Sequence, residues 1–76
     1  MTAFDMRNRI DSLVGHVLFD YKGHNCGVDP FSRNNIDMWY GQEFMNAKSI
    51  DEVMSTPFFD GNALQDIMND IANIEC

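Results

Sequence analysis

The chain has 76 residues, of which 45% are hydrophobic and 12% aromatic, and its formal net charge is −7. This length and aromatic content predict a single domain over residues 1–76 and exclude a disordered chain. The segment from Ser49 onward carries six acids and no base. Direct nucleic-acid binding needs a basic surface, so we expect instead a protein partner with a basic surface.

Neither a membrane span nor a secretion signal is expected. The longest apolar runs are three residues, far short of the ~20 that a spanning helix requires. The amino-terminal segment MTAFDMRNRIDS is charged from Asp5 onward and contains no apolar stretch typical of a signal peptide. We therefore expect a cytoplasmic protein in which Cys26 and Cys76 stay reduced.

The first predicted element is a helix from Ala3 to Val14. Apolar residues recur there at helical spacing, Thr2 can cap the first turn, and Asp5 can accept hydrogen bonds from exposed backbone N–H groups. Gly15 can adopt the left-handed conformation that ends many helices.

Three short segments then alternate apolar and polar residues with the period of a β-strand. They are His16 to Tyr21, Cys26 to Phe31 and Ile36 to Tyr40. Turn-forming residues at 22–25 and 32–35 connect them as two consecutive hairpins. The next segment, 42–47, has no clear period and receives no assignment.

Two helices are predicted to complete the chain. Ser49 and Glu52 fit a capping box that opens a short helix, and Pro57 ends it. Asp60 is expected to cap a longer helix with one apolar stripe, made of Leu64, Ile67, Met68, Ile71 and Ile74. The predicted fold class is α+β: a three-stranded antiparallel meander flanked by an N-terminal helix and two C-terminal helices, in the order α-β-β-β-α-α.

His24 and Cys26 are the candidates for chemistry, because a histidine and a cysteine this close could hold a metal or form a thiol–base pair. The chain contains only two His and two Cys, without CxxC or HxxxH spacing. We therefore expect no catalytic residue, no metal and no cofactor. His24 is interpreted as the tip of a turn and Cys26 as a small residue facing the core. A metal- or thiol-dependent protein is the less favoured alternative.

Five residues are predicted to bind the partner. Asp51, Glu52, Asp66 and Asp70 would present carboxylates from the two C-terminal helices to a basic counterpart. Trp39 alternates with the apolar positions of its strand and could be an exposed anchor. Two alternatives stay open: the acids form an ordinary solvated surface, or a helix covers Trp39.

The segments YKGHNCGVDPFS, DMWYG and SIDEVMSTPFFDG resemble small uncharacterised proteins of phages, mobile elements and anaerobic Gram-positive bacteria. The resemblance covers most of the chain from Val17 to Ile71 and rests on turn and cap residues. It implies no activity and no catalytic residues. It implies a small, acidic, cytoplasmic protein encoded by a mobile element, a class that includes inhibitors such as anti-CRISPR proteins.

Charge and resemblance together predict a non-enzymatic partner-binding protein. The favoured hypothesis is an inhibitor of the anti-CRISPR kind, whose acidic C-terminal helices occupy a basic nucleic-acid-binding surface. The alternative is a cellular accessory domain with apolar partner contacts, in which the acidity serves solubility.

Overall fold

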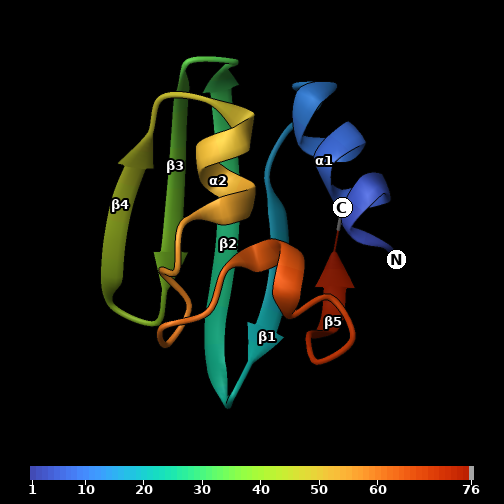
Figure 1. Ribbon diagram of the computed structural model, residues 1–76, viewed down its shortest axis with the longest axis vertical. Coiled ribbons are helices and arrows are strands. Elements are labelled where there is room, and N and C mark those ends of the chain that lie inside the picture. Colours follow the sequence, from blue (N-terminus) through green and yellow to red (C-terminus); the bar gives the residue numbers. More distant parts are fainter. Residues whose placement is uncertain (76) are drawn as a thin grey trace.

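The computed structural model describes residues 1–75, which form a five-stranded antiparallel sheet with two α-helices on one face (Figure 1). The strands lie in the order β4-β3-β2-β1-β5. In chain order the elements are α1 (Ala3–Asp11), β1 (Val17–Tyr21), β2 (His24–Ser32), β3 (Asn35–Tyr40), β4 (Glu43–Ala47), α2 (Ile50–Ser55), the 3-10 turn η1 (Leu64–Asp66) and β5 (Ala72–Glu75). The class is α+β, but the prediction of a three-stranded sheet with three helices is wrong.

Helix α1 begins with a capping box. The Thr2 hydroxyl accepts the Asp5 N–H, and the Asp5 carboxylate accepts the Thr2 N–H, both at 3.1 Å. The hydrogen bond from the Thr2 N–H lowers the pKa of Asp5. The helix ends at Asp11 rather than at Val14, because Leu13 already has a left-handed φ of 56°.

The sheet gains a strand where the sequence shows no clear period. Segment 43–47 forms β4, which pairs with β3 from Tyr40↔Glu43 to Ile36↔Ala47 after a turn at Gly41. Its alternation is weak because β4 is an edge strand and Phe44 is 74% exposed. An apolar residue that faces solvent conceals the usual inside–outside pattern.

The last predicted helix, from Asp60 onward, is absent. Asp60 and Gly61 have φ of 54° and 79° and form a tight turn, around which Phe59 and Asn62 exchange backbone hydrogen bonds of 3.0 Å. Positive φ at both central residues defines the type I′ turn that Asp-Gly favours. This dipeptide is therefore a turn and not a helix cap. The chain then makes only η1 before it returns as β5 along the edge of β1.

Local and tertiary causes explain why no helix forms there. The segment is rich in Asp, Asn and Gly, which favour turns over helix interiors. Asp66 and Asp70 would also repel each other one helical turn apart. As a strand, segment 72–75 instead satisfies the hydrogen-bonding edge of β1. The apolar residues of the stripe still lie in or against the core: Leu64, Ile67, Met68, Ile71 and Ile74.

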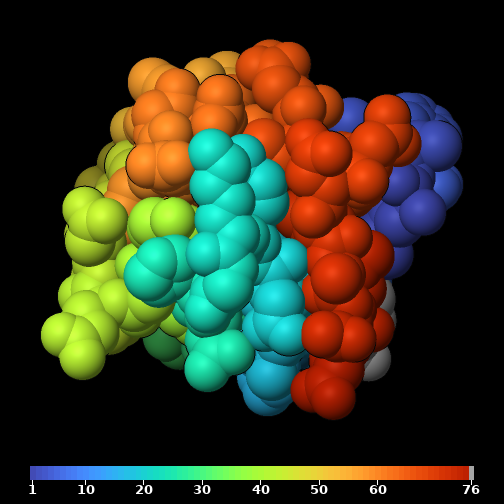
Figure 2. All heavy atoms as spheres, turned by 90° about the horizontal axis from the view of Figure 1, so that it is seen from below, coloured from blue at the N-terminus to red at the C-terminus, as the bar shows by residue number. Residues whose placement is uncertain are grey.

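The core lies between the helices and one face of the sheet. Every second residue of the central strands points into it. Each of the three central strands contributes buried side chains to it, such as Phe19 from β1, Val28 from β2 and Met38 from β3. Seen from below, the segment from α2 to η1 (golden to orange) lies along one side of the strands (Figure 2). We call the opposite side of the sheet, which carries no helix, the open face. No helix among residues 1–75 is long and apolar enough to span a bilayer.

Candidate functional site

The open face carries a row of residues that crosses four strands. Leu18 of β1 faces Gly27 of β2, Gly27 faces Trp39 of β3, and Trp39 faces Phe44 of β4. Side chains at facing positions of neighbouring strands lie on the same side of a sheet. Leu18 and Trp39 are partly exposed and Phe44 is mostly exposed, so this row is an apolar surface in contact with solvent.

Gly27 makes room for the Trp39 ring. A Cβ atom at position 27 would lie 2.1 Å from Cζ2 of Trp39 and 2.6 Å from Cε2. The indole therefore lies directly on the backbone of β2, where only a glycine allows so close an approach. The sheet thus holds the single tryptophan of the chain in a fixed position on the open face.

Four carboxylates share the open face with this row. Asp20, Asp29 and Asp37 lie there by the alternation of their strands, and Glu75 lies there because it faces Leu18. Asp29 and Asp37 occupy directly opposite positions on β2 and β3. Like charges in that arrangement destabilise a sheet, and the hydrogen bond that Asp37 accepts from the Asn46 amide at 2.8 Å offsets only part of this repulsion.

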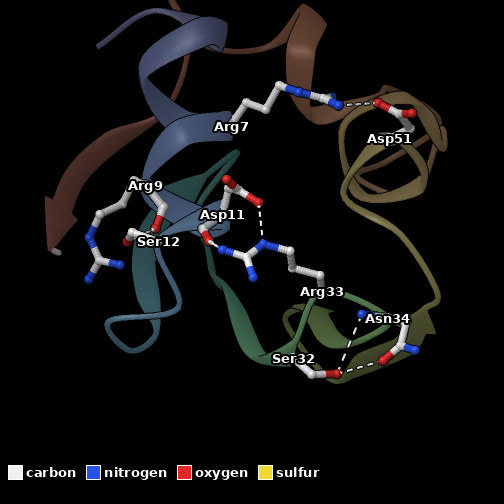
Figure 3. A network of polar contacts seen from close by, with 8 residues as sticks. All are labelled: Arg7, Arg9, Asp11, Ser12, Ser32, Arg33, Asn34 and Asp51. Atoms are coloured by element: carbon white, nitrogen blue, oxygen red, sulfur yellow. Dashed lines mark hydrogen bonds and ion pairs between the residues drawn. The ribbon is translucent and has the colours of Figure 1, made fainter.

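The bases of the chain are engaged away from this surface. Three ion pairs hold the turns and helices together: Arg7 with Asp51, Lys22 with Asp60 and Arg33 with Asp11. Figure 3 shows the first and the last of these, which join α1 to α2 and to the turn after β2.

The two remaining bases also leave the open face almost free of positive charge. Arg9 donates hydrogen bonds to the backbone oxygens of Gly15 and His16. Lys48 donates to the side-chain oxygen of Asn46, and the Asn46 amide donates to Asp37 at 2.8 Å, so one ammonium lies at the β4 edge of the open face. Within residues 1–75, no Lys or Arg nitrogen lies within 4.0 Å of a carboxylate oxygen on the open face. The open face is therefore an acidic and aromatic surface whose carboxylates form no direct ion pair within residues 1–75, although Lys48 approaches Asp37 through Asn46.

A cavity of about 340 Å³ opens beside the tryptophan, between the apolar row and β5. Side chains of the open face line it: Leu18, Asp20, Asn25, Trp39, Asn73 and Glu75. An irregularity in the pairing of β1 with β5 brings the last two side chains there. Between Leu18 and Asp20, β1 has one residue, whereas the facing part of β5 has two, Asn73 and Ile74, which is a β-bulge. Asn73 takes a φ of 54° there. The Asn73 amide donates to the Asp20 carboxylate at 2.7 Å.

The structure separates the residues predicted to bind a partner. Asp51 is exposed but forms the ion pair with Arg7, and Glu52 accepts the Lys48 N–H at 2.6 Å as part of the α2 cap. Asp66 lies in η1 and Asp70 in the turn that follows, both exposed, so they form no row on a helix. Trp39 lies across the sheet from α2, on the open face, and no helix covers it.

Sequence reasoning missed most of the open face. Of the five residues predicted to bind a partner, Trp39 alone lies there. The others on this face are the four carboxylates and the apolar Leu18 and Phe44. A signal for four of them exists in the alternation of the central strands, where Leu18, Asp20, Asp29 and Asp37 occupy positions that face away from the core. The other two belong to strands that the sequence pattern does not reveal.

His24 and Cys26 do not form a joint site. The His24 ring packs on Tyr40 with centroids 4.7 Å apart and is exposed, whereas Cys26 is buried on the core side. The Cys26 thiol lies 3.5 Å from the backbone oxygen of His24, not against its imidazole. Among residues 1–75, no group of three or more His, Cys, Asp or Glu side chains is arranged to hold a metal ion.

We expect the Cys26 thiol to be unreactive in the folded protein. Burial raises its pKa from the ordinary 9.0 to about 11, so the thiolate fraction at pH 8 falls about 100-fold, and access is restricted as well. In a Cys76→Ser background, Ellman's reagent at pH 8 should react at least ~100-fold more slowly with the native than with the urea-unfolded protein. A fast native reaction would contradict this and indicate a nucleophilic thiol.

The same shift predicts a loss of stability at alkaline pH. The unfolded thiol ionises near pH 9.0 and the folded one near 11. The contribution of Cys26 to folding is therefore complete below pH 9 and declines as the pH rises toward 11.

In comparisons with protein-family models, curated proteins and solved structures, no family, relative or structural neighbour matches this chain. The resemblance to proteins of mobile elements stays a prediction.

Proposed function

We propose that this chain is a non-enzymatic binding protein that docks the open face of its sheet on a basic surface of a protein partner. The observation that carries the proposal is the combination, on one face, of an exposed apolar row with four carboxylates that form no ion pair within residues 1–75. Aromatic anchors surrounded by polar groups are typical of protein interfaces, and complementary charge selects the partner and speeds association.

The facing pair Asp29 and Asp37 supports a cationic partner in particular. A sheet gains nothing from two carboxylates in opposite positions, and a Lys or Arg side chain placed between them would remove the repulsion. Natural sequences accept such local conflicts mainly where function requires them. Leu18, Trp39 and Phe44 would supply the apolar part of the same interface.

A more specific form of this proposal is an inhibitor encoded by a mobile element that acts in the cytoplasm. Protein surfaces that bind nucleic acid are basic, because they neutralise phosphates. An acidic face of this kind would compete with nucleic acid for such a surface. The open face, rather than Asp51, Glu52, Asp66 and Asp70, would make this contact.

The proposal is tested by mapping where a cationic probe binds. We expect hexalysine amide, titrated into the ¹⁵N-labelled protein at low salt, to shift amide signals of the strands around the open face, and salt to weaken the effect. Shifts concentrated on α2 and η1 would overturn the proposal.

Asp29→Asn and Asp66→Asn form a matched pair for this titration, since each removes one carboxylate, from opposite sides of the sheet; Asp29 is partly exposed and Asp66 exposed. Asp29→Asn should weaken hexalysine binding several-fold and at the same time raise the free energy of unfolding by about 0.2–1 kcal/mol, because it removes the repulsion with Asp37. Asp66→Asn should leave hexalysine binding nearly unchanged. Equal weakening by both variants would indicate adsorption by overall charge and contradict a specific face.

A further inference from the structure

We propose that the cavity beside Trp39 receives a single arginine side chain of the partner. This inference rests on the proposed function and assigns the central contact of that interface. The cavity measures about 340 Å³, within the range of small-ligand sites, and it opens on the open face next to the apolar row. Its position places whatever enters it against the indole, at the middle of the surface.

The lining of the cavity matches a cation. Asp20 and Glu75 contribute carboxylates, and within residues 1–75 neither forms an ion pair. Asn73 uses its amide N–H to hold Asp20, which leaves the Asn73 side-chain oxygen as an acceptor. These groups would repel a phosphate or a carboxylate and attract a positive charge.

Arginine fits this lining better than lysine. A guanidinium is planar and has five N–H donors, so it can bind two carboxylates and an amide oxygen together while one face stacks on an aromatic ring. A lysine ammonium offers a compact charge that cannot combine both kinds of contact as fully. The indole of Trp39, held on Gly27, supplies the ring in a fixed position.

Trp39 is the only tryptophan of the chain, so its fluorescence reports directly on occupation of the cavity. The probe is the peptide Ac-Gly-Arg-Gly-NH2, with two comparison peptides in which lysine or citrulline replaces arginine. Citrulline keeps the shape of arginine and removes its charge. We expect saturable fluorescence changes with a Kd in the millimolar range for arginine, at least about fivefold weaker binding for lysine, and none for citrulline.

Three conservative variants localise the contact. Asp20→Asn and Glu75→Gln should each weaken arginine-peptide binding about tenfold, since each removes one charged hydrogen-bond acceptor from the cavity. Asp66→Asn removes the same charge from the helix side of the sheet, outside the cavity and outside the open face, and should change the affinity less than twofold. Because Asp20 also holds Asn73, Glu75→Gln serves as the variant that leaves that hydrogen bond intact.

The inference is overturned if citrulline binds as well as arginine, or if Asp66→Asn weakens binding as much as Glu75→Gln does. Its failure is distinguishable from failure of the proposed function. If hexalysine maps to the open face but the arginine peptide shows no selectivity, the docking face stands and the cavity assignment falls. If hexalysine binds elsewhere, both fall.

Discussion

Replacement of Phe59 by alanine is expected to lower the free energy of unfolding by about 3–5 kcal/mol. Phe59 is fully buried, and its ring packs on Phe19, Tyr40 and Phe58 at centroid distances of 5.6, 6.4 and 5.2 Å. The substitution would remove the contact that attaches the irregular segment after α2 to the sheet. Since a domain of this length has a total stability of roughly 4–11 kcal/mol, the substitution would remove about a quarter or more of it.

Urea unfolding followed by far-UV circular dichroism measures this change. Phe44→Ala is the matched control, because it removes the same side chain from a position that is 74% exposed, and it should alter stability by no more than about 0.5 kcal/mol. If Phe59→Ala does not fold, Phe59→Leu keeps an apolar side chain and allows a smaller loss to be measured. Equal costs for Phe44→Ala and Phe59→Ala would contradict the core assignment.

Gly27→Ala is expected to displace the Trp39 ring from the sheet and to destabilise the domain by about 1–3 kcal/mol. Gly27 is not in the left-handed region, so the backbone itself accepts alanine, and the effect arises from the new methyl group, which would lie 2.1 Å from the indole. A red shift of the tryptophan emission should accompany the loss of stability. The arginine peptide should also bind more weakly, because the wall of the cavity moves.

A double-mutant cycle with Trp39→Ala separates this contact from other effects of the substitution. Without the indole, Gly27→Ala should be neutral or slightly stabilising, because alanine loses less conformational freedom than glycine in a strand. The cycle should therefore show a coupling energy of about 1 kcal/mol or more. Additive effects of the two substitutions would show that the ring does not depend on the glycine.

The elements that the sequence predicts well are those with a complete local signal. The capping box at Thr2 and Asp5 places the start of α1, and Ser49 caps α2 with an N–H···O bond of 3.0 Å from Glu52. The strands β1, β2 and β3 occupy the three alternating segments, because each is central enough to bury one side. Cys26 faces the core, as its phase on the strand predicts.

The candidate site could be predicted only in part, because it depends on which face of the sheet the helices cover and which face stays in contact with solvent. The alternation of β3 predicts an outward position for Trp39, and the structure has it there. The acids predicted on helices do not form one surface, because Asp51 forms an ion pair and Glu52 caps its own helix. The cavity requires β5 beside β1, with Asn73 and Glu75 on the open face. The four residues of β5 contain no local pattern that predicts its pairing with β1.

By itself, then, the sequence determined the acidic charge, the start of each helix, the three central strands and the apolar positions of the core. Only the tertiary structure decided that segments 43–47 and 72–75 become edge strands. It also decided that four carboxylates, those of Asp20, Asp29, Asp37 and Glu75, share the side without helices. The physical reason is that a helix makes its hydrogen bonds within one segment, whereas a strand obtains them from a neighbour. The apolar residues from Leu64 to Ile74 therefore pack in or against the core although they lie in a 3-10 turn and a strand, because the free edge of β1 supplies the hydrogen bonds of that strand.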